Sequence, residues 1–215
     1  MAVSCWQMQA MRWWFKQQTI ALSTHADQIQ NGLLQDLFAI RLRLQAPLSE
    51  QSEDGMSQQQ AWISEAKKLH DQLTHLNEAL IPPYLAESLP LAIQSLLKQW
   101  ELSHPHNQLR MDLPYGWRPE PLERSWMILK TLETLLNLAI SASLPHVSLE
   151  VTLIDQSPQA ELQIKVTYPD RLTHLSLTRT RELKYLCHCF RCLAPGRCFY
   201  YSRALTAVWR FQWNS

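Results

Sequence analysis

Two long runs of helical periodicity, at 3–45 and 58–80, constrain the fold of this chain more than any other feature. The first run contains no proline, and its apolar positions recur at heptad steps and then at steps of four and three: Met8, Phe15, Leu22, Ile29, Leu33, Leu37, Ile40 and Leu44. The change of phase between the two sets is typical of a stutter. A helix this long is not stable by propensity alone, so its apolar stripe must pack against another helix or another chain.

The second run also carries an apolar seam, at alternating steps of four and three: Trp62, Ala66, Leu69, Leu73, Leu76 and Leu80. Residues 46–57 between the two runs are polar and predict a turn. Two helices joined in this way form an antiparallel hairpin, and two hairpins form a four-helix bundle. We therefore expect a homodimer with an interface at Leu33, Leu37, Ile40, Leu44, Trp62, Leu69, Leu73 and Leu76.

Pro82 and Pro83 end the second helix and predict a domain boundary, with a helical hairpin at 1–81 and a second domain at 82–215. In the second domain the pattern predicts helices at 85–101, 119–143 and 178–193. Alternating runs predict strands at 108–113, 147–154, 161–168, 199–202 and 207–213. This order of elements predicts an α+β fold, with a layer of helices on one side of a mostly antiparallel sheet.

Composition limits the possible partners and setting. The net charge is +1, and no long basic run favours nucleic acid or a membrane surface. No apolar run reaches the ~20 residues of a spanning helix. Five cysteines, an odd number, do not suggest a disulfide framework, so a cytoplasmic setting is the simplest interpretation. Only four glycines occur, and no two lie close enough for a phosphate-binding loop.

Residues 30–45, QNGLLQDLFAIRLRLQ, resemble the first helix of the dimerisation domain in NarL-type sensor histidine kinases. In that family the stretch usually begins His-Asp-Gly and continues Leu-Leu-Gln. Further along the chain, LIPPYL at 80–85 resembles the family's junction, and ETLLN at 133–137 resembles the N box that helps to hold Mg²⁺. The resemblance implies that 82–215 forms an α/β-sandwich like the family's ATPase domain, here without its lid.

The sequence differs from the family at the residues that carry out the family's chemistry. Gln30 stands at the position of the phosphoacceptor histidine, and an amide side chain cannot be phosphorylated in that way. Of the family's nucleotide-binding residues, only three have counterparts in this chain: Glu133, Asn137 and Asp170. No glycine directly follows Asp170. The resemblance therefore implies a pseudokinase with a degenerate nucleotide site and no cofactor.

One family activity has a counterpart here. Members that dephosphorylate their response regulators use Asp-x-x-x-Gln, and this chain has Asn31 and Gln35 at the same spacing. The two side chains are one turn apart on one helix face, so Gln35 can orient a water molecule in a partner's active site. The alternative interpretation is that Gln35 is an ordinary solvated residue.

Other clusters admit two interpretations each. The thiols of Cys187, Cys189, Cys192 and Cys198 suit zinc or redox sensing, but buried structural thiols are the commoner case. The aromatic group Trp6, Trp13 and Trp14 is either an exposed patch for a partner or part of a core, whereas Trp100, Trp126, Trp209 and Trp213 are expected in the core. His25 is an alternative phosphoacceptor, although a packed histidine is the favoured interpretation.

The function expected from the sequence is that of a non-catalytic, dimeric signalling or adaptor protein that binds a response regulator or another signalling protein. A response-regulator phosphatase that uses Gln35 is the first alternative. A cysteine-based metal or redox sensor is the second.

Overall fold

The computed structural model describes residues 5–28, helical positions within 63–73, Pro82, and residues 84–140 and 146–214. The chain divides into two compact units, one formed by Met1–Phe15 with Pro83–Ser215 and the other by Lys16–Pro82. The break at 82/83 lies beside the Pro82-Pro83 pair. The first fifteen residues group with the C-terminal part, whereas the sequence prediction placed them in the hairpin domain; the boundary at 81/82 stays a prediction.

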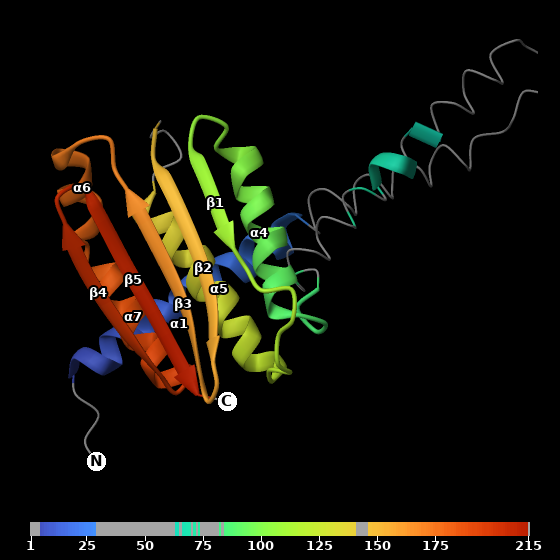
Figure 1. The fold of residues 1–215 in the computed structure, drawn as a ribbon. Helices are drawn as coiled ribbons and strands as arrows, with labels where there is room; N and C mark the ends of the chain where they lie inside the picture. The colour runs from blue at the N-terminus through green and yellow to red at the C-terminus, as the bar shows by residue number, and fades with distance from the viewer. Residues whose placement is uncertain are drawn as a thin grey trace, which may run out of the picture. The chain divides into compact units, whose positions relative to one another are not determined.

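The C-terminal unit is an α+β fold, as the sequence predicts, with helices on one face of a five-stranded sheet (Figure 1). Its helices are α4 (Leu89–Ser103), α5 (Leu122–Ala139), α6 (Arg171–Thr178) and α7 (Arg181–Leu193). Its strands are β1 (Gln108–Asp112), β2 (Ser148–Gln156), β3 (Gln159–Thr167), β4 (Gly196–Arg203) and β5 (Thr206–Asn214). The first part of α1 (Cys5–Gln28) packs onto this unit.

The sheet has the strand order β1-β2-β3-β5-β4. Only β1 and β2 pair in parallel, and the other three neighbouring pairs are antiparallel. Strands β2 and β3 form a hairpin, with Gln156 opposite Gln159 and only Ser157 and Pro158 in the turn. The mostly antiparallel sheet predicted from the alternating runs is therefore confirmed.

The core lies between the sheet and the helices. Alternate residues of β2, β3 and β5 face it, as strand geometry requires, and three large side chains in it are almost fully buried: Phe190, Trp209 and Trp213. Phe190 of α7 meets Phe211 edge to face, with ring centroids 4.9 Å apart. Trp100, Trp209 and Trp213 are buried and Trp126 is half-buried, so the predicted core tryptophans pack in or against the core.

The three helices predicted in this unit have different bounds in the structure, and the one predicted at 119–143 spans Leu122–Ala139. The helix predicted from Leu85 begins at Leu89, because Tyr84 opens a turn with φ 63° and a proline occupies the first helical turn. The helix predicted from 178 is preceded by the separate helix α6, which the sequence analysis missed. Asp170 begins α6, and the chain leaves helical geometry at Arg179 before α7 starts.

The helix predicted at 3–45 is confirmed over Cys5–Gln28, but α1 packs by a different face than its heptad stripe. Ala10 is fully buried and Trp14 is 6% exposed, whereas Met8, Phe15 and Leu22 are 46%, 74% and 62% exposed. The reason is that α7 offers aromatic and thiol side chains to the Ala10 face. Trp6 and Trp13 both contact Tyr185, and the Cys189 thiol donates to the Ala10 carbonyl at 3.4 Å.

Little of the predicted second helix is described. Its described positions are helical: 63, 64, 66–69, 71 and 73. Leu69 is half-buried, and Leu73 is 48% exposed. The remaining predicted interface residues lie outside the described part of the chain: Leu33, Leu37, Ile40, Leu44, Trp62 and Leu76. No helix in the described part is long and apolar enough to cross a membrane.

Candidate functional site

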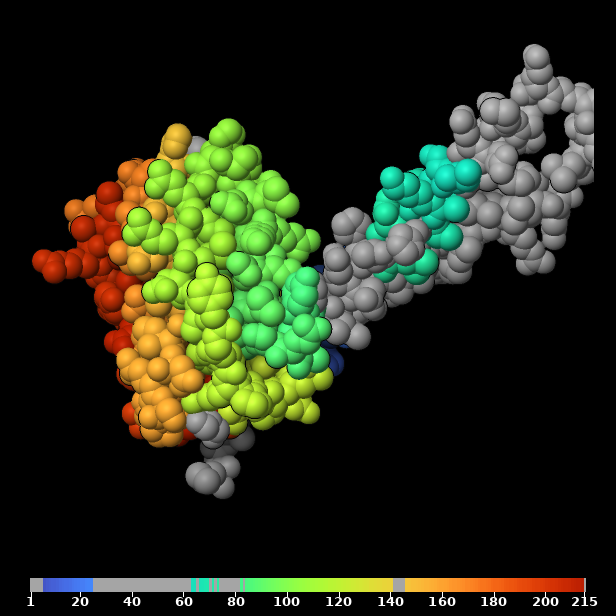
Figure 2. All heavy atoms as spheres, turned by 45° about the vertical axis from the view of Figure 1, so that its right-hand side comes forward, coloured from blue at the N-terminus to red at the C-terminus, as the bar shows by residue number. Residues whose placement is uncertain are grey.

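Glu133 and Asn137, the counterparts of the N box, lie one turn apart on α5 and line the same cavity. This cavity has a volume of about 300 Å³ and lies between α5 and α4, whose Trp100 and His104 form its other wall. Figure 2 shows the side of the unit where α4 and α5 meet. The Glu133 carboxylate accepts a hydrogen bond from Lys130 at 2.8 Å, and Asn137 is exposed. Trp100 stacks on His104 with ring centroids 4.5 Å apart.

Asp170, the third nucleotide-site counterpart, lies on a different element and has a structural role. Its carboxylate caps the N-terminus of α6, accepting the Thr173 backbone N–H at 2.9 Å and the Thr173 hydroxyl at 2.6 Å. Both hydrogen bonds lower the pKa of Asp170, and the bond from the Thr173 side chain has the larger effect. The residue is not among those that line the cavity of Glu133 and Asn137.

The segment after β3 is packed around a buried pair of rings. Tyr168 is 2% exposed, and its hydroxyl donates to the Ala139 carbonyl at the end of α5 at 2.9 Å. Burial raises the pKa of this phenol above its ordinary value. His174 meets Tyr168 edge to face at 5.4 Å, and its Nε2 shares a hydrogen bond with Ser202 at 2.8 Å. These contacts join α5, α6 and β4 directly.

Direct packing of helices also closes this side of the sheet. Helix α5 packs against both α6 and α7. Leu132, Leu135 and Leu136 of α5 are buried in the core. Glu133, which lies between Leu132 and Leu135 in the sequence, lines the cavity on the α4 side instead. Glu133 and Asn137 therefore lie on α5, whereas Asp170 lies much later in the chain, at the N-terminus of α6.

The four clustered cysteines occupy three different environments. Cys189 is fully buried, and burial raises the pKa of its thiol to about 12. Cys192 is exposed and lies 3.5 Å from the Nε2 atom of His188. Cys187 is partly buried and Cys198 is buried, and the two line one cavity together. Within the described part of the chain, no three His, Cys, Asp or Glu side chains gather as metal ligands would.

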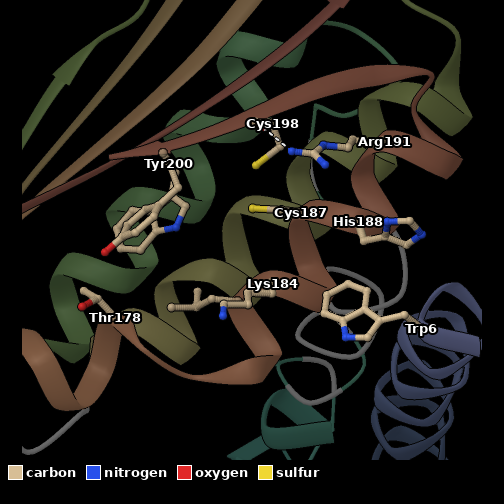
Figure 3. A pocket seen from close by; sticks show the side chains of 10 residues that line it. Trp6, Thr178, Lys184, Cys187, His188, Arg191, Cys198 and Tyr200 are labelled. Carbon is tan, nitrogen blue, oxygen red and sulfur yellow. Dashed lines mark hydrogen bonds between the residues drawn. The ribbon is translucent and has the colours of Figure 1, made fainter. Parts of the chain in front are cut away.

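A second cavity of about 300 Å³ lies where α7, β4 and the start of α1 meet (Figure 3). Cys187 and Cys198 line it together with the aromatic rings of Trp6, Tyr200 and Trp209. Lys184, His188 and Arg191 contribute basic groups from three positions along α7. The described residues that line the cavity include no carboxylate, so the surroundings suit an anionic ligand.

Several predicted site residues cannot be placed. Gln30, Asn31 and Gln35 lie outside the described residues, and so does the side chain of His25. The predicted aromatic patch is only partly exposed. Trp6 is 44% exposed, but Trp13 is half-buried and Trp14 is buried.

Sequence reasoning missed the basic residues beside the thiols. Lys184, His188 and Arg191 recur at steps of four and three, so they share a helix face with Cys187. That spacing was available in the sequence, but the approach of Cys198 from β4 was not. The contact of Tyr168 with Ala139 joins residues 29 positions apart and had no local signal.

No protein-family model and no curated protein sequence matches the chain. Among solved structures it is similar to the catalytic domain of the histidine kinase ThkA, with 14% identity, a TM-score of 0.45, and coverage of 59% of this chain and 89% of that one. It is also similar to the histidine kinase AdeS of Acinetobacter baumannii, with 13% identity, a TM-score of 0.42, and coverage of 83% and 94%. The blue-light activated histidine kinase of Erythrobacter litoralis matches at 9% identity, a TM-score of 0.49, and coverage of 86% and 59%. Similarity at this level supports no conclusion about activity.

Proposed function

We propose that this chain is a non-catalytic, histidine-kinase-like signalling or adaptor protein. It dimerises through its helical hairpin and binds a response regulator or another signalling protein on the resulting bundle. The sequence resemblance motivates the proposal, because residues 30–45 keep the family's sequence pattern while Gln30 replaces the phosphoacceptor. In this proposed function, the C-terminal unit serves as a folded support and binds no nucleotide.

The position of Asp170 is the observation that carries the proposal. A nucleotide site needs its polar groups to converge on one ligand. The Asp170 carboxylate instead accepts hydrogen bonds from the backbone N–H and the hydroxyl of Thr173. Glu133 and Asn137 face a cavity beside α4. The Tyr168–His174 pair supports the proposal further, because it packs between the end of α5 and α6, the elements that carry these groups.

Exposed apolar side chains support the dimer. Phe15, Leu22 and Leu73 belong to the predicted stripes and are 74%, 62% and 48% exposed in the single chain. Each exposed side chain of this size gains roughly 1.5–3 kcal/mol when it is fully buried. A second copy that covers the stripes would therefore gain free energy from several such residues.

Titration calorimetry with Mg²⁺ and ATP tests the nucleotide part of the proposal. We expect no saturable heat up to millimolar ATP and no label after incubation with γ-labelled ATP. The catalytic domain of an active histidine kinase serves as the positive control. Micromolar affinity for ATP would overturn the proposal.

The variant Gln30→His separates the two lost functions. It restores an imidazole at the phosphoacceptor position and leaves the C-terminal unit unchanged. We expect it to stay unlabelled by ATP, since the phosphoryl donor has no site. Self-labelling of Gln30→His would show that the C-terminal unit binds and uses ATP.

Partner binding is tested with purified receiver domains immobilised in parallel, each with and without phosphorylation. Saturable binding of at least one receiver domain supports the proposal, and binding of none removes response regulators as the partner class. The same mixtures test the phosphatase alternative. If Gln35 orients a water molecule, Gln35→Ala slows loss of the regulator's phosphoryl group, and equal rates exclude that role.

A further inference from the structure

The cavity in Figure 3 holds two thiols that the proposed function does not use. Cys187 comes from α7 and Cys198 from β4, and both side chains line the same cavity (Figure 3). Cys198 is 4% exposed, whereas Cys187 is only partly buried. Cys187 is therefore the more accessible thiol of the pair.

The surroundings of this pair favour a thiolate on Cys187. The hydrogen bond from Cys198 lowers the pKa of Cys187, burial opposes the shift, and the positive charge of Arg191 adds to it. Arg191 is held in place because its guanidinium donates to the Cys198 carbonyl at 2.7 Å. The pKa of Cys198 moves upward, first because it donates to Cys187 and then because it is buried. A thiolate is the nucleophilic form of cysteine.

The same cavity has features that select a reagent. Lys184 and Arg191 are exposed cations at its edge, and His188 stands between them on α7. The rings of Trp6, Tyr200 and Trp209 give it an apolar, aromatic wall. Acidic residues are absent from the described lining. These features attract a small molecule that carries negative charge beside apolar or aromatic groups.

We propose that Cys187 and Cys198 form a reactive dithiol that reduces anionic low-molecular-weight disulfides bound in this cavity. The Cys187 thiolate attacks one sulfur atom of the bound disulfide, forming a mixed disulfide and releasing the other half as a thiolate. Cys198 then loses its proton to solvent and attacks the sulfur of Cys187, which releases the second thiolate. The two protein thiols are oxidised to one Cys187–Cys198 disulfide, and the small disulfide is reduced to two thiols.

The proposal does not depend on kinase or adaptor function. It assigns a disulfide bond between α7 and β4, next to the place where Trp6 of α1 packs on α7. The oxidant class is defined by charge and by the disulfide bond, and glutathione disulfide is one member of it.

The experiment uses the full chain with Cys5→Ser and Cys192→Ser, which leaves Cys187, Cys189 and Cys198. The probe is 5,5′-dithiobis(2-nitrobenzoate), an anionic aromatic disulfide whose thiolate product absorbs light. We expect two thiolates released for each chain, no retained adduct and a mass lower by two hydrogens. Dithiothreitol should restore the original mass.

Single substitutions assign the two roles. With Cys198→Ser, and with Cys198→Ala as a second variant, we expect one thiolate released and a nitrobenzoate adduct retained on Cys187. With Cys187→Ser, release should fall at least tenfold. Cys189 is the internal control, because it lies on the same helix but is buried and donates to Ala10, and it should stay unmodified until the protein is unfolded. Unchanged release by Cys187→Ser, or a retained adduct in the parent protein, would overturn the proposal.

A further comparison tests the selection of anions. Lys184→Ala should slow the reaction with the anionic probe by roughly fivefold at low salt, since one nearby charge is lost. The neutral reagent 4,4′-dithiodipyridine should react with Lys184→Ala and the parent at similar rates. Equal slowing with both reagents would show that the cavity does not select its disulfide by charge.

Discussion

At the residue scale, the start of β4 has no room for a side chain. A Cβ atom on Gly196 would lie 2.5 Å from the Gln212 carbonyl oxygen and 2.5 Å from a ring carbon of Phe190. Phe190 is fully buried and Gln212 contributes backbone, so neither neighbour can move freely. The glycine is required here by close approach and not by an unusual backbone angle.

We predict that Gly196→Ala lowers the free energy of unfolding by about 1–3 kcal/mol, the usual range for overpacking. Urea denaturation followed by tryptophan fluorescence measures the change. Gly116→Ala is the matched control, because nothing lies within 4 Å of its added Cβ atom. A loss of stability as large in Gly116→Ala would contradict the steric explanation.

Glu161 is a charged residue with an almost buried side chain. Its carboxylate accepts hydrogen bonds from Arg210 at 2.6 and 2.7 Å and from Gln212 at 2.6 Å. Burial acts to raise the pKa of Glu161, but the hydrogen bonds from Arg210 and Gln212 and the charge of Arg210 outweigh it and lower the pKa. The ionised form is therefore more stable in the folded chain than in the unfolded one.

The sign of this shift sets a pH dependence. Because the pKa is depressed on folding, the carboxylate stabilises the fold at pH values above 4.5, and the contribution is lost as the pH falls below that value. Glu161→Gln should lower the free energy of unfolding at pH 7 by about 1–3 kcal/mol. The difference from the parent should shrink as the pH approaches 3.

Glu150→Gln is the control for this measurement. Glu150 of β2 pairs with Lys165 of β3 at 3.0 Å in the same sheet, but both side chains are partly exposed, at 34% and 43%. Such a pair contributes about 0–1 kcal/mol. A difference between Glu161→Gln and the parent that persists unchanged at pH 3 would refute the ionisation argument.

At the element scale, α1 shows where periodicity succeeded and where it did not. The prediction of a helix held over Cys5–Gln28, because the segment lacks proline and carries regular apolar spacing. The buried face could not be predicted from the heptad positions. Ala10 and Trp14 lie off that stripe, and they are buried because α7 presents Tyr185 and Cys189 to them from far along the chain.

Replacing Ala10 tests this packing. We predict that Ala10→Leu disrupts the contact of α1 with α7, because the fully buried methyl group has no space for a longer side chain. Hydrogen exchange at residues 5–15 should become faster by about tenfold or more, which corresponds to a loss of ~1.4 kcal/mol or more in local stability. Ala21→Leu changes an exposed position of the same helix and should leave exchange at 5–15 unchanged. Faster exchange in both variants would point to a general effect on α1.

The two helices at 171–193 show a second limit of sequence reasoning. The helix α7 was predicted from its apolar spacing, but no helix was predicted at the position of α6. The signal was present in Asp170, a good N-cap residue, followed by Thr173 three positions later. The resemblance to a nucleotide-binding family favoured a ligand role for Asp170, whereas the local backbone chemistry assigns it a cap.

At the scale of the whole molecule, the order of elements and the antiparallel sheet were predictable, because alternating and helical periods differ clearly in this chain. The surroundings of Glu133, Asn137 and Asp170 were not predictable from the sequence pattern alone. Their final positions depend on which side of α5 faces the sheet and on the packing of Tyr168 under Ala139. Such contacts join residues that are distant in sequence.

The predicted dimer gives a test at the same scale. Leu73→Glu places a charge in the seam of the second helix, and burying an unpaired charge is unfavourable. We expect its dimer to dissociate at a concentration at least tenfold higher than the parent's, measured by light scattering during gel filtration. Ser64→Glu adds the same charge at an exposed helical position outside the seam and should leave the dimer intact. A Leu73→Glu variant as dimeric as Ser64→Glu would exclude this seam from the interface.

The place of β4 at the end of the sheet has a consequence for solubility. An edge strand offers unpaired backbone groups to another strand, and β4 presents three consecutive, roughly half-exposed aromatic residues, Phe199, Tyr200 and Tyr201. If two copies paired antiparallel about Tyr200, Arg197 of one copy would stand opposite Arg203 of the other. Like charges directly opposite each other destabilise such a pair. The two arginines therefore oppose this pairing of β4 with a second copy of itself.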